Sequence, residues 1–128
     1  MGYPVAKTSC EEMTMDYSQL SDFEINCEVL AVFEPDVNHM CLSESKGYFY
    51  DCGPVGDGWH QIDIPDYCNN PEYALPIILA NRIGMLPSEM KCKEQWISTS
   101  GKGQFEYHEN PLRAAMIVFL MMQDANNA

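Results

Sequence analysis

The chain has 128 residues, 46% hydrophobic and 11% aromatic, with 19 acidic and 7 basic side chains and a net charge of −12 at pH 7. This length suits one domain with a single core, and the apolar content excludes an intrinsically disordered protein. Residues 1–64 hold 12 acids and 2 bases, which disfavours binding to a nucleic-acid backbone. The acidity serves solubility in its simplest interpretation, and otherwise it attracts a basic partner.

The N-terminal segment and the cysteines both indicate an intracellular protein. Residues 1–19 are expected to form a weakly ordered tail in which no apolar stretch follows a basic region, so no secretory signal is expected. Ala6 occupies the position where N-myristoylation requires Ser or Thr. The six cysteines are widely scattered, which favours reduced thiols over a disulfide framework. They are Cys10, Cys27, Cys41, Cys52, Cys68 and Cys92.

The first helix is predicted from Ser21 to Phe33. Ser21 and Glu24 have capping-box spacing just before an apolar-periodic stretch, and acids in the first turn suit the positive end of the helix dipole. Pro35 ends the helix, and residues 35–47 are expected to form a loop.

Two hairpins and a second helix are predicted next. Strands over 47–51 and 59–64 flank a Gly/Pro-rich turn, and strands over 94–99 and 104–108 flank Ser-Gly-Lys-Gly. Between the hairpins, Asn70-Pro71 opens a helix that runs to about Ile83, with a bend at Pro76.

The last helix is the strongest local signal. Asn110 is a capping residue, Pro111 suits the first helical position, and residues 114–122 are uninterruptedly apolar. Nine apolar residues are too few for a bilayer span, which needs roughly 20, so a buried core helix is expected. We therefore predict a single α+β domain over residues 20–124, in which about three helices back one antiparallel sheet of about four strands.

Three segments resemble the NinX-like family of small tailed-phage proteins, a family of unknown function. They are LSDFEINCEVL at 20–30, YCNNPEYALPIILANRIGM at 67–85 with EQWIST after it, and ENPLRAAMIVFLMMQ at 109–123. Together they cover most of the chain, although Leu75 before Pro76 departs mildly from the family pattern. The resemblance implies a phage accessory protein that works in the host cytoplasm. The resemblance does not indicate which activity the protein has, and it assigns no catalytic residues.

Reactive constellations are weak. No spacing of Cys or His is typical of a metal site, so neither a metal nor a cofactor is expected. Cys68 precedes a helix start, and His60 or His108 is a candidate base for it, but a structural thiol is the simpler interpretation. Asp63 and Asp66 are a candidate carboxylate pair, and solvated turn acids are again the simpler interpretation.

A ligand site at the helix starts makes more physical sense. Asn69, Asn70 and Arg113 offer donors near two positive helix ends, where an anion or nucleotide finds backbone N–H groups. Trp59, Trp96 and Tyr107 are candidates for a stacking face under a base. In the plainer alternative, Asn70 and Asn110 only cap helices, Arg113 pairs with Glu109, and both tryptophans fill the core.

These observations give one leading hypothesis and two alternatives. The leading one is non-catalytic binding that counteracts a host defence system, by occupying a host protein or by sequestering a small nucleotide-like ligand. The alternatives are a small hydrolase that uses Cys68 or a carboxylate pair, and an acidic mimic of DNA. We expect no membrane association, and a homodimer is a possible state.

Overall fold

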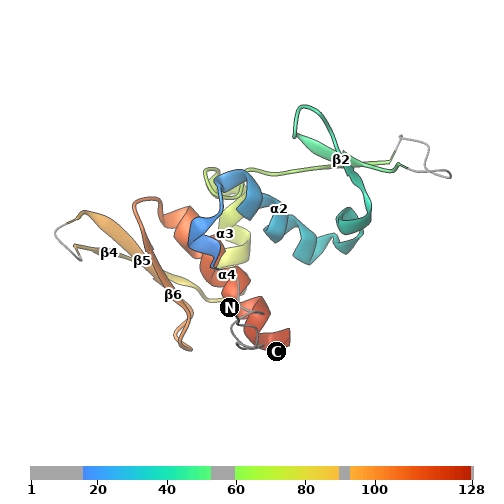
Figure 1. The fold of residues 1–128 in the computed structure, drawn as a ribbon. Coiled ribbons are helices and arrows are strands. Elements are labelled where there is room, and N and C mark those ends of the chain that lie inside the picture. Colours follow the sequence, from blue (N-terminus) through green and yellow to red (C-terminus); the bar gives the residue numbers. More distant parts are fainter. Residues whose placement is uncertain (1–15, 53–59, 90–92, 128) are drawn as a thin grey trace, which may run out of the picture.

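The computed structural model describes residues 16–52, 60–89 and 93–127. Helix α4 runs through the middle, with a three-stranded sheet on one side and helices α2 and α3 on the other (Figure 1). The helices are η2 (Tyr17–Gln19), α2 (Asp22–Phe33), η3 (Pro35–His39), α3 (Pro71–Ala80) and α4 (Pro111–Asn127). The strands are β1 (Cys41–Leu42), β2 (Tyr48–Tyr50), β3 (Gln61–Asp63), β4 (Gly84–Ser88), β5 (Gln95–Thr99) and β6 (Phe105–His108).

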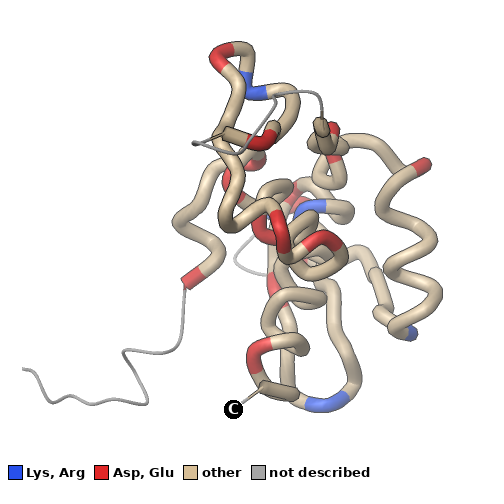
Figure 2. Tube along the Cα trace, turned by 90° about the vertical axis from the view of Figure 1, so that its right-hand side faces the viewer, with Lys and Arg blue, Asp and Glu red and all other residues tan. Residues whose placement is uncertain are grey.

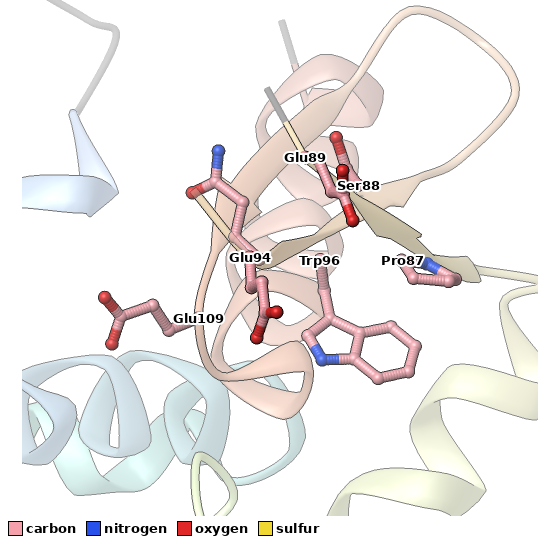
Figure 3. A pocket seen from close by; sticks show the side chains of 7 residues that line it. Pro87, Ser88, Glu89, Glu94, Trp96 and Glu109 are labelled. Carbon is pink, nitrogen blue, oxygen red and sulfur yellow. The ribbon is translucent and has the colours of Figure 1, made fainter. Parts of the chain in front are cut away.

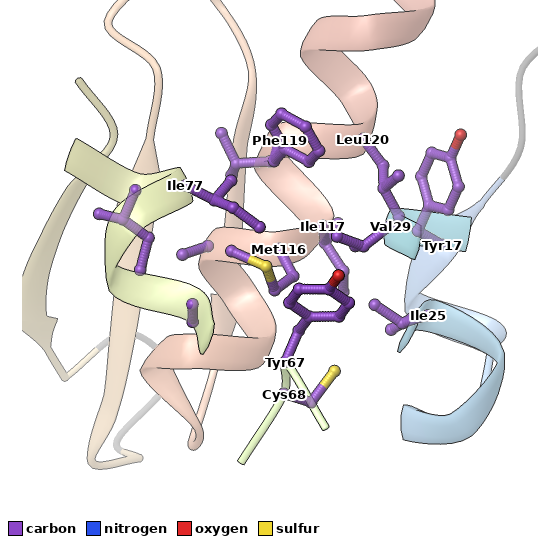
Figure 4. Packing of buried hydrophobic residues seen from close by; sticks show 14 of the residues in the cluster. Tyr17, Ile25, Val29, Tyr67, Cys68, Ile77, Met116, Ile117, Phe119 and Leu120 are labelled. Atoms are coloured by element: carbon purple, nitrogen blue, oxygen red, sulfur yellow. The ribbon is translucent and has the colours of Figure 1, made fainter. Parts of the chain in front are cut away.

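Helix α4 is the centre of the core, as its sequence predicts. Every residue from 113 to 120 is buried, and the helix contacts α2, α3 and all three strands β4, β5 and β6. Ile25 and Val29 of α2 and Ile77 of α3 lie around it (Figure 4). A helix with such a surface is stable only when protein surrounds it. No helix among the described residues is long and apolar enough to cross a bilayer.

The predicted helix starts are confirmed with their caps. In α2 the Glu24 N–H donates to Ser21 Oγ at 3.1 Å, and the Ser21 N–H donates to Glu24 Oε1 at 2.9 Å, which completes the capping box. In α3 the Glu72 N–H donates to Asn70 Oδ1 at 3.0 Å. Helix α3 ends at Ala80, earlier than expected, because the chain turns at Arg82 (φ 56°) and enters β4.

The prediction of one four-stranded sheet is wrong. The described residues form two separate three-stranded antiparallel sheets, β1-β2-β3 and β4-β5-β6. Each predicted hairpin gains a strand from a segment expected to be a loop, β1 from 35–47 and β4 from 85–93. These two strands gave no signal because β1 has two residues and β4 contains Pro87, which sequence rules exclude from all but edge strands.

Two other expectations need correction. Cys41 and Cys52 form a disulfide, with their Cα atoms 6.0 Å apart, where reduced thiols were expected. The antiparallel pairing of β1 with β2 brings them together, because Cys41 lies opposite Tyr50, two residues before Cys52. Residues 16–19, assigned to the N-terminal tail, carry η2, and Tyr17 is buried in the core. Residues 1–15 and the predicted turn at 53–58 lie outside the described residues.

The central position of α4 gives a test of stability. Ile117 is 1% exposed, so Ile117→Ala should lower the free energy of unfolding by about 3 kcal/mol, through lost apolar burial and the cavity left behind. Leu79→Ala is the matched control, because Leu79 is 74% exposed and should change the free energy by less than about 0.5 kcal/mol. Urea unfolding followed by circular dichroism measures both. Equal midpoints for the two variants would contradict the assignment of α4 to the core.

Candidate functional site

The first turn of α4 carries a buried guanidinium. Arg113 is 7% exposed, and its Nη1 lies 2.7 Å from Asp22 Oδ1 at the start of α2. Its Nη2 donates to the carbonyl oxygens of Leu20 at 2.6 Å and Ser18 at 3.3 Å. The expected pairing of Arg113 with Glu109 is therefore replaced by an ion pair between two helix starts.

Amide side chains extend this contact into a network. Asn69 Nδ2 donates to Asp22 Oδ2 and to Asp66 Oδ1, both at 3.1 Å. Asn26 is buried and donates through Nδ2 to Asp66 Oδ1 at 3.0 Å. Asn110 Nδ2 donates to the Cys68 carbonyl oxygen at 2.7 Å and to Asn69 Oδ1 at 3.1 Å. We call this set the polar junction; it comprises Asp22, Asn26, Asp66, Asn69, Asn110 and Arg113.

The polar junction brings together some of the residues that the sequence offered to a ligand. Asn69 and Arg113 lie in it, whereas Asn70 caps α3 outside it. The donors of Asn69 and both terminal nitrogens of Arg113 are engaged by groups of the protein itself. An anion at this place would have to displace the Asp22 carboxylate. The junction is therefore suited to holding helix starts together, and less suited to capturing a nucleotide.

The junction shifts the titration of its carboxylate. Burial raises the pKa of Asp22, but hydrogen bonds from Arg113 and Asn69, with the guanidinium charge, outweigh burial and hold the pKa below its usual value. Burial also lowers the pKa of His108, helped by the charge of Arg113. Its Nδ1 accepts a hydrogen bond from the Asn110 N–H at 2.9 Å, as a neutral imidazole can.

The groups proposed for hydrolysis are poorly placed for it. Cys68 is 0% exposed, and burial, with the nearby Asp22 carboxylate, raises the pKa of its thiol to about 12. A nucleophilic cysteine needs a lowered pKa and access to substrate. Asp66 accepts hydrogen bonds from Asn26 and Asn69, while Asp63 is exposed on β3. The described residues contain no group of three or more His, Cys, Asp or Glu able to hold a metal ion.

A hollow of about 620 Å³ lies at one end of the β4-β5-β6 sheet. Figure 3 shows the Glu94 side chain beside the indole of Trp96, with Glu109 set apart from both. All three glutamates in its wall are exposed to solvent. We call this hollow the Trp96 groove; its lining is Pro87, Ser88, Glu89, Glu94, Gln95, Trp96 and Glu109.

Sequence reasoning missed the carboxylates of the groove, although the predicted second hairpin held the signal for two of them. In the register of β5 and β6, Trp96 lies opposite His108, so Glu94 and Glu109 fall at the same end of the hairpin. Glu89 joins them through β4, which was not predicted.

The predicted stacking face is not formed by its two described members. Trp96 lies opposite His108, and Tyr107 lies opposite Ile97. Because neighbouring residues of a strand point to opposite faces, Trp96 and Tyr107 lie on different sides of the sheet. Trp96 is half-buried in the groove wall and is not a core residue. Trp59 lies outside the described residues.

A second hollow, of about 330 Å³, lies between α2 and the end of α4. Its wall includes Tyr17, Glu28 and Asp124, and the Tyr17 hydroxyl donates to Asp124 Oδ2 at 2.7 Å. Burial, with the charge of Asp124, raises the pKa of Glu28. Asp124 is thus already used in fixing η2 to α4, which makes this hollow the weaker candidate.

The comparisons with known proteins give one match. The family model described as Bacteriophage P22, NinX matches residues 16–123. No curated protein and no solved structure matches the chain.

The polar junction predicts a pH-dependent stability. Asp22 has a lowered pKa in the folded state, so its stabilisation is present above the unfolded pKa, about 4, and is lost as the pH falls through the folded pKa. Asp22→Asn should therefore cost about 2 kcal/mol at pH 7, a value reduced by the 42% exposure of the carboxylate side chain, and the deficit should narrow below about pH 4. Urea titrations from neutral to acidic pH measure it.

Asp36→Asn is the control for this experiment, because Asp36 is an exposed acid in η3 and should change the free energy of unfolding little at any pH. A deficit for Asp22→Asn that is the same at pH 3 and pH 7 would contradict the assigned role of the ion pair.

The burial of Cys68 predicts an inert thiol. In the folded protein, iodoacetamide should alkylate Cys68 about 100-fold more slowly than in urea, because reaction requires local unfolding. Mass spectrometry of the labelled peptides reports the rate at this residue. Rapid labelling of Cys68 in the native state would revive the hydrolase hypothesis.

Proposed function

Since the chain belongs to the phage family described as Bacteriophage P22, NinX, we propose that it acts inside the infected bacterium by non-catalytic binding of a positively charged host protein. The observation that carries this proposal is the Trp96 groove, whose lining combines an indole with three glutamates, of which Glu94 lies beside the ring (Figure 3). The hypothesis that such binding counteracts a host defence system remains a prediction.

The groove has the chemistry of a site for a lysine or arginine side chain. A cation over an indole face gains about 0.5–2 kcal/mol, more as water is excluded. Hydrogen bonds from an ammonium or guanidinium to carboxylates are stronger than neutral ones. An anionic ligand such as a nucleotide phosphate is disfavoured here, because Glu89, Glu94 and Glu109 repel its negative charge. The groove thus favours the protein-binding form of the hypothesis over sequestering of a nucleotide.

The charge of the whole molecule supports the same choice. Acidic residues are spread along much of the chain trace, and few lysines and arginines interrupt them (Figure 2). With a net charge of −12, the protein attracts basic surfaces over about the Debye length of 8–10 Å and raises their association rate. An acidic DNA mimic would need carboxylates spaced like phosphates. The groove instead combines carboxylates with an aromatic ring, which suits a side chain.

The proposal is tested by distinguishing the effect of the groove carboxylates on binding from the effect of the protein's overall charge. Glu89→Gln, Glu94→Gln and Glu109→Gln combined should lower the affinity for a lysine-rich peptide at least tenfold, because the cation loses its carboxylate partners. Asp36→Asn, Glu44→Gln and Asp63→Asn combined remove the same charge from exposed positions elsewhere and should have the smaller effect. In a Trp59→Phe background, the fluorescence of Trp96 reports occupancy directly.

The same two triple variants are then compared on immobilised protein with bacterial lysate. Basic proteins retained by the wild type should be lost from the groove variant and kept by the control, and added salt should weaken their retention. If both variants lose the retained basic proteins equally, the binding depends on overall charge alone, and the proposed site is contradicted.

A further inference from the structure

The β4-β5-β6 sheet has a second face that α4 does not cover. Met85 and Ser98 lie on the covered side, where Ser98 is 0% exposed and Met85 packs against the core. On the opposite side, Leu86, Ile97 and Tyr107 lie directly across from one another on the three strands. Figure 1 shows this side of the sheet turned away from α4. We call it the outer face; it comprises Gly84, Leu86, Ser88, Gln95, Ile97, Thr99, Phe105 and Tyr107.

The outer face carries no charged side chain, and four of its eight residues are the large apolar or aromatic side chains Leu86, Ile97, Phe105 and Tyr107. Leu86 is 59% and Phe105 is 52% exposed, and the Phe105 and Tyr107 rings meet edge to face at 6.0 Å. In a protein with 19 acidic residues, eight uncharged positions on three adjacent strands form a distinct surface. The cores of protein interfaces are depleted in charge and enriched in Tyr and Phe. This composition is typical of a surface that another sheet covers.

The two ends of this sheet carry opposite charge. Glu89 follows β4, Glu94 precedes β5 and Glu109 follows β6 at one end. Lys93 accompanies these three acids, as does Lys91 in the sequence of the same connection, outside the described residues. At the other end, Arg82 precedes β4 and Lys102 lies in the turn between β5 and β6, and both are exposed. The sheet is therefore negative at one end and positive at the other.

We propose that two copies of this chain associate through their outer faces, related by a two-fold axis at right angles to the strands. Such an axis reverses the strand direction, so the positive end of each sheet lies over the negative end of its partner. A two-fold axis parallel to the strands would place the acidic ends together. Charge complementarity thus selects a second copy in one orientation, with Lys102 of each protomer facing Glu109 of the other.

The dimer does not require the proposed function, but the two surfaces meet at one end of the sheet, where Ser88, Gln95 and Glu109 border both the groove and the interface. Trp96 and Ile97 are neighbours in β5 and point to opposite faces, so the indole of the groove stays on the side away from the interface. A dimer presents two Trp96 grooves to one partner, which raises avidity without any new contact.

The test is the mass of the wild-type protein in solution against variants of the outer face. Sedimentation equilibrium at concentrations up to the order of 100 μM should give twice the 14.5 kDa chain mass. Leu86→Glu combined with Phe105→Glu should raise the dimer dissociation constant at least tenfold, because carboxylates cannot be buried there unpaired. Leu79→Glu is the control, since it adds a carboxylate at an exposed leucine of α3 and should leave the mass unchanged.

A charge swap tests the orientation. Lys102→Glu and Glu109→Lys should each weaken the dimer several-fold, and the two changes in one chain should restore it, because each contact is then reversed rather than broken. Both positions are exposed, so circular dichroism should show an unchanged fold. A monomeric wild type over this range overturns the proposal. So does a dimer that keeps its affinity in the Leu86→Glu, Phe105→Glu variant, or a double swap no tighter than the single changes.

Discussion

The ion pair between Arg113 and Asp22 is the constraint on which the rest of the structure depends. Arg113 opens the run of eight buried residues in α4, so the helix cannot enter the core without burying a guanidinium. A buried charge without a partner costs several kcal/mol, and Asp22 with two backbone carbonyls offsets that cost. The start of α2 must therefore meet the start of α4. This contact joins the two helix starts at the edge of the core, where α2 packs against the apolar helix.

The same requirement sets the position of the sheet end. Strand β6 passes into α4 through Glu109 and Asn110, and Asn110 is held by the Cys68 carbonyl and by Asn69. Glu109 is thus held between a fixed helix start and a paired strand. The position of β6 in turn sets the position of the Trp96 groove, because β5 pairs with β6 and β4 pairs with β5. The polar residues of the junction hydrogen-bond to one another, whereas the groove and the outer face are the two surfaces for which we propose partners.

The sequence predicted the features that depend on residues close together in the chain, and it missed those that depend on distant residues. The capping box of Ser21 and Glu24, the cap at Asn70 and the apolar run of α4 involve residues within one or two turns, and all were predicted correctly. The pairing of β4 with β5 involves a proline-containing strand without alternation, so no local pattern marked it. The partner of Arg113 lies 91 positions away, and a nearby acid, Glu109, was the natural but wrong choice. The sequence indicated Asn69 and Arg113 as hydrogen-bond donors for a ligand. In the structure these donors bind carboxylates of the protein itself.

The two open surfaces differ in a way that separates their roles. The groove is lined by carboxylates and one indole, so binding of a cation there should weaken with salt. The outer face carries no charge, so its association is driven by burial of Leu86, Ile97, Phe105 and Tyr107, with the charged ends setting only the orientation. Added salt should therefore release a basic partner from the groove before it separates two copies of the chain. Strand β5 contributes Trp96 to one surface and Ile97 to the other, so period-two alternation along a single strand points the indole away from the proposed interface, while Glu109 borders both surfaces.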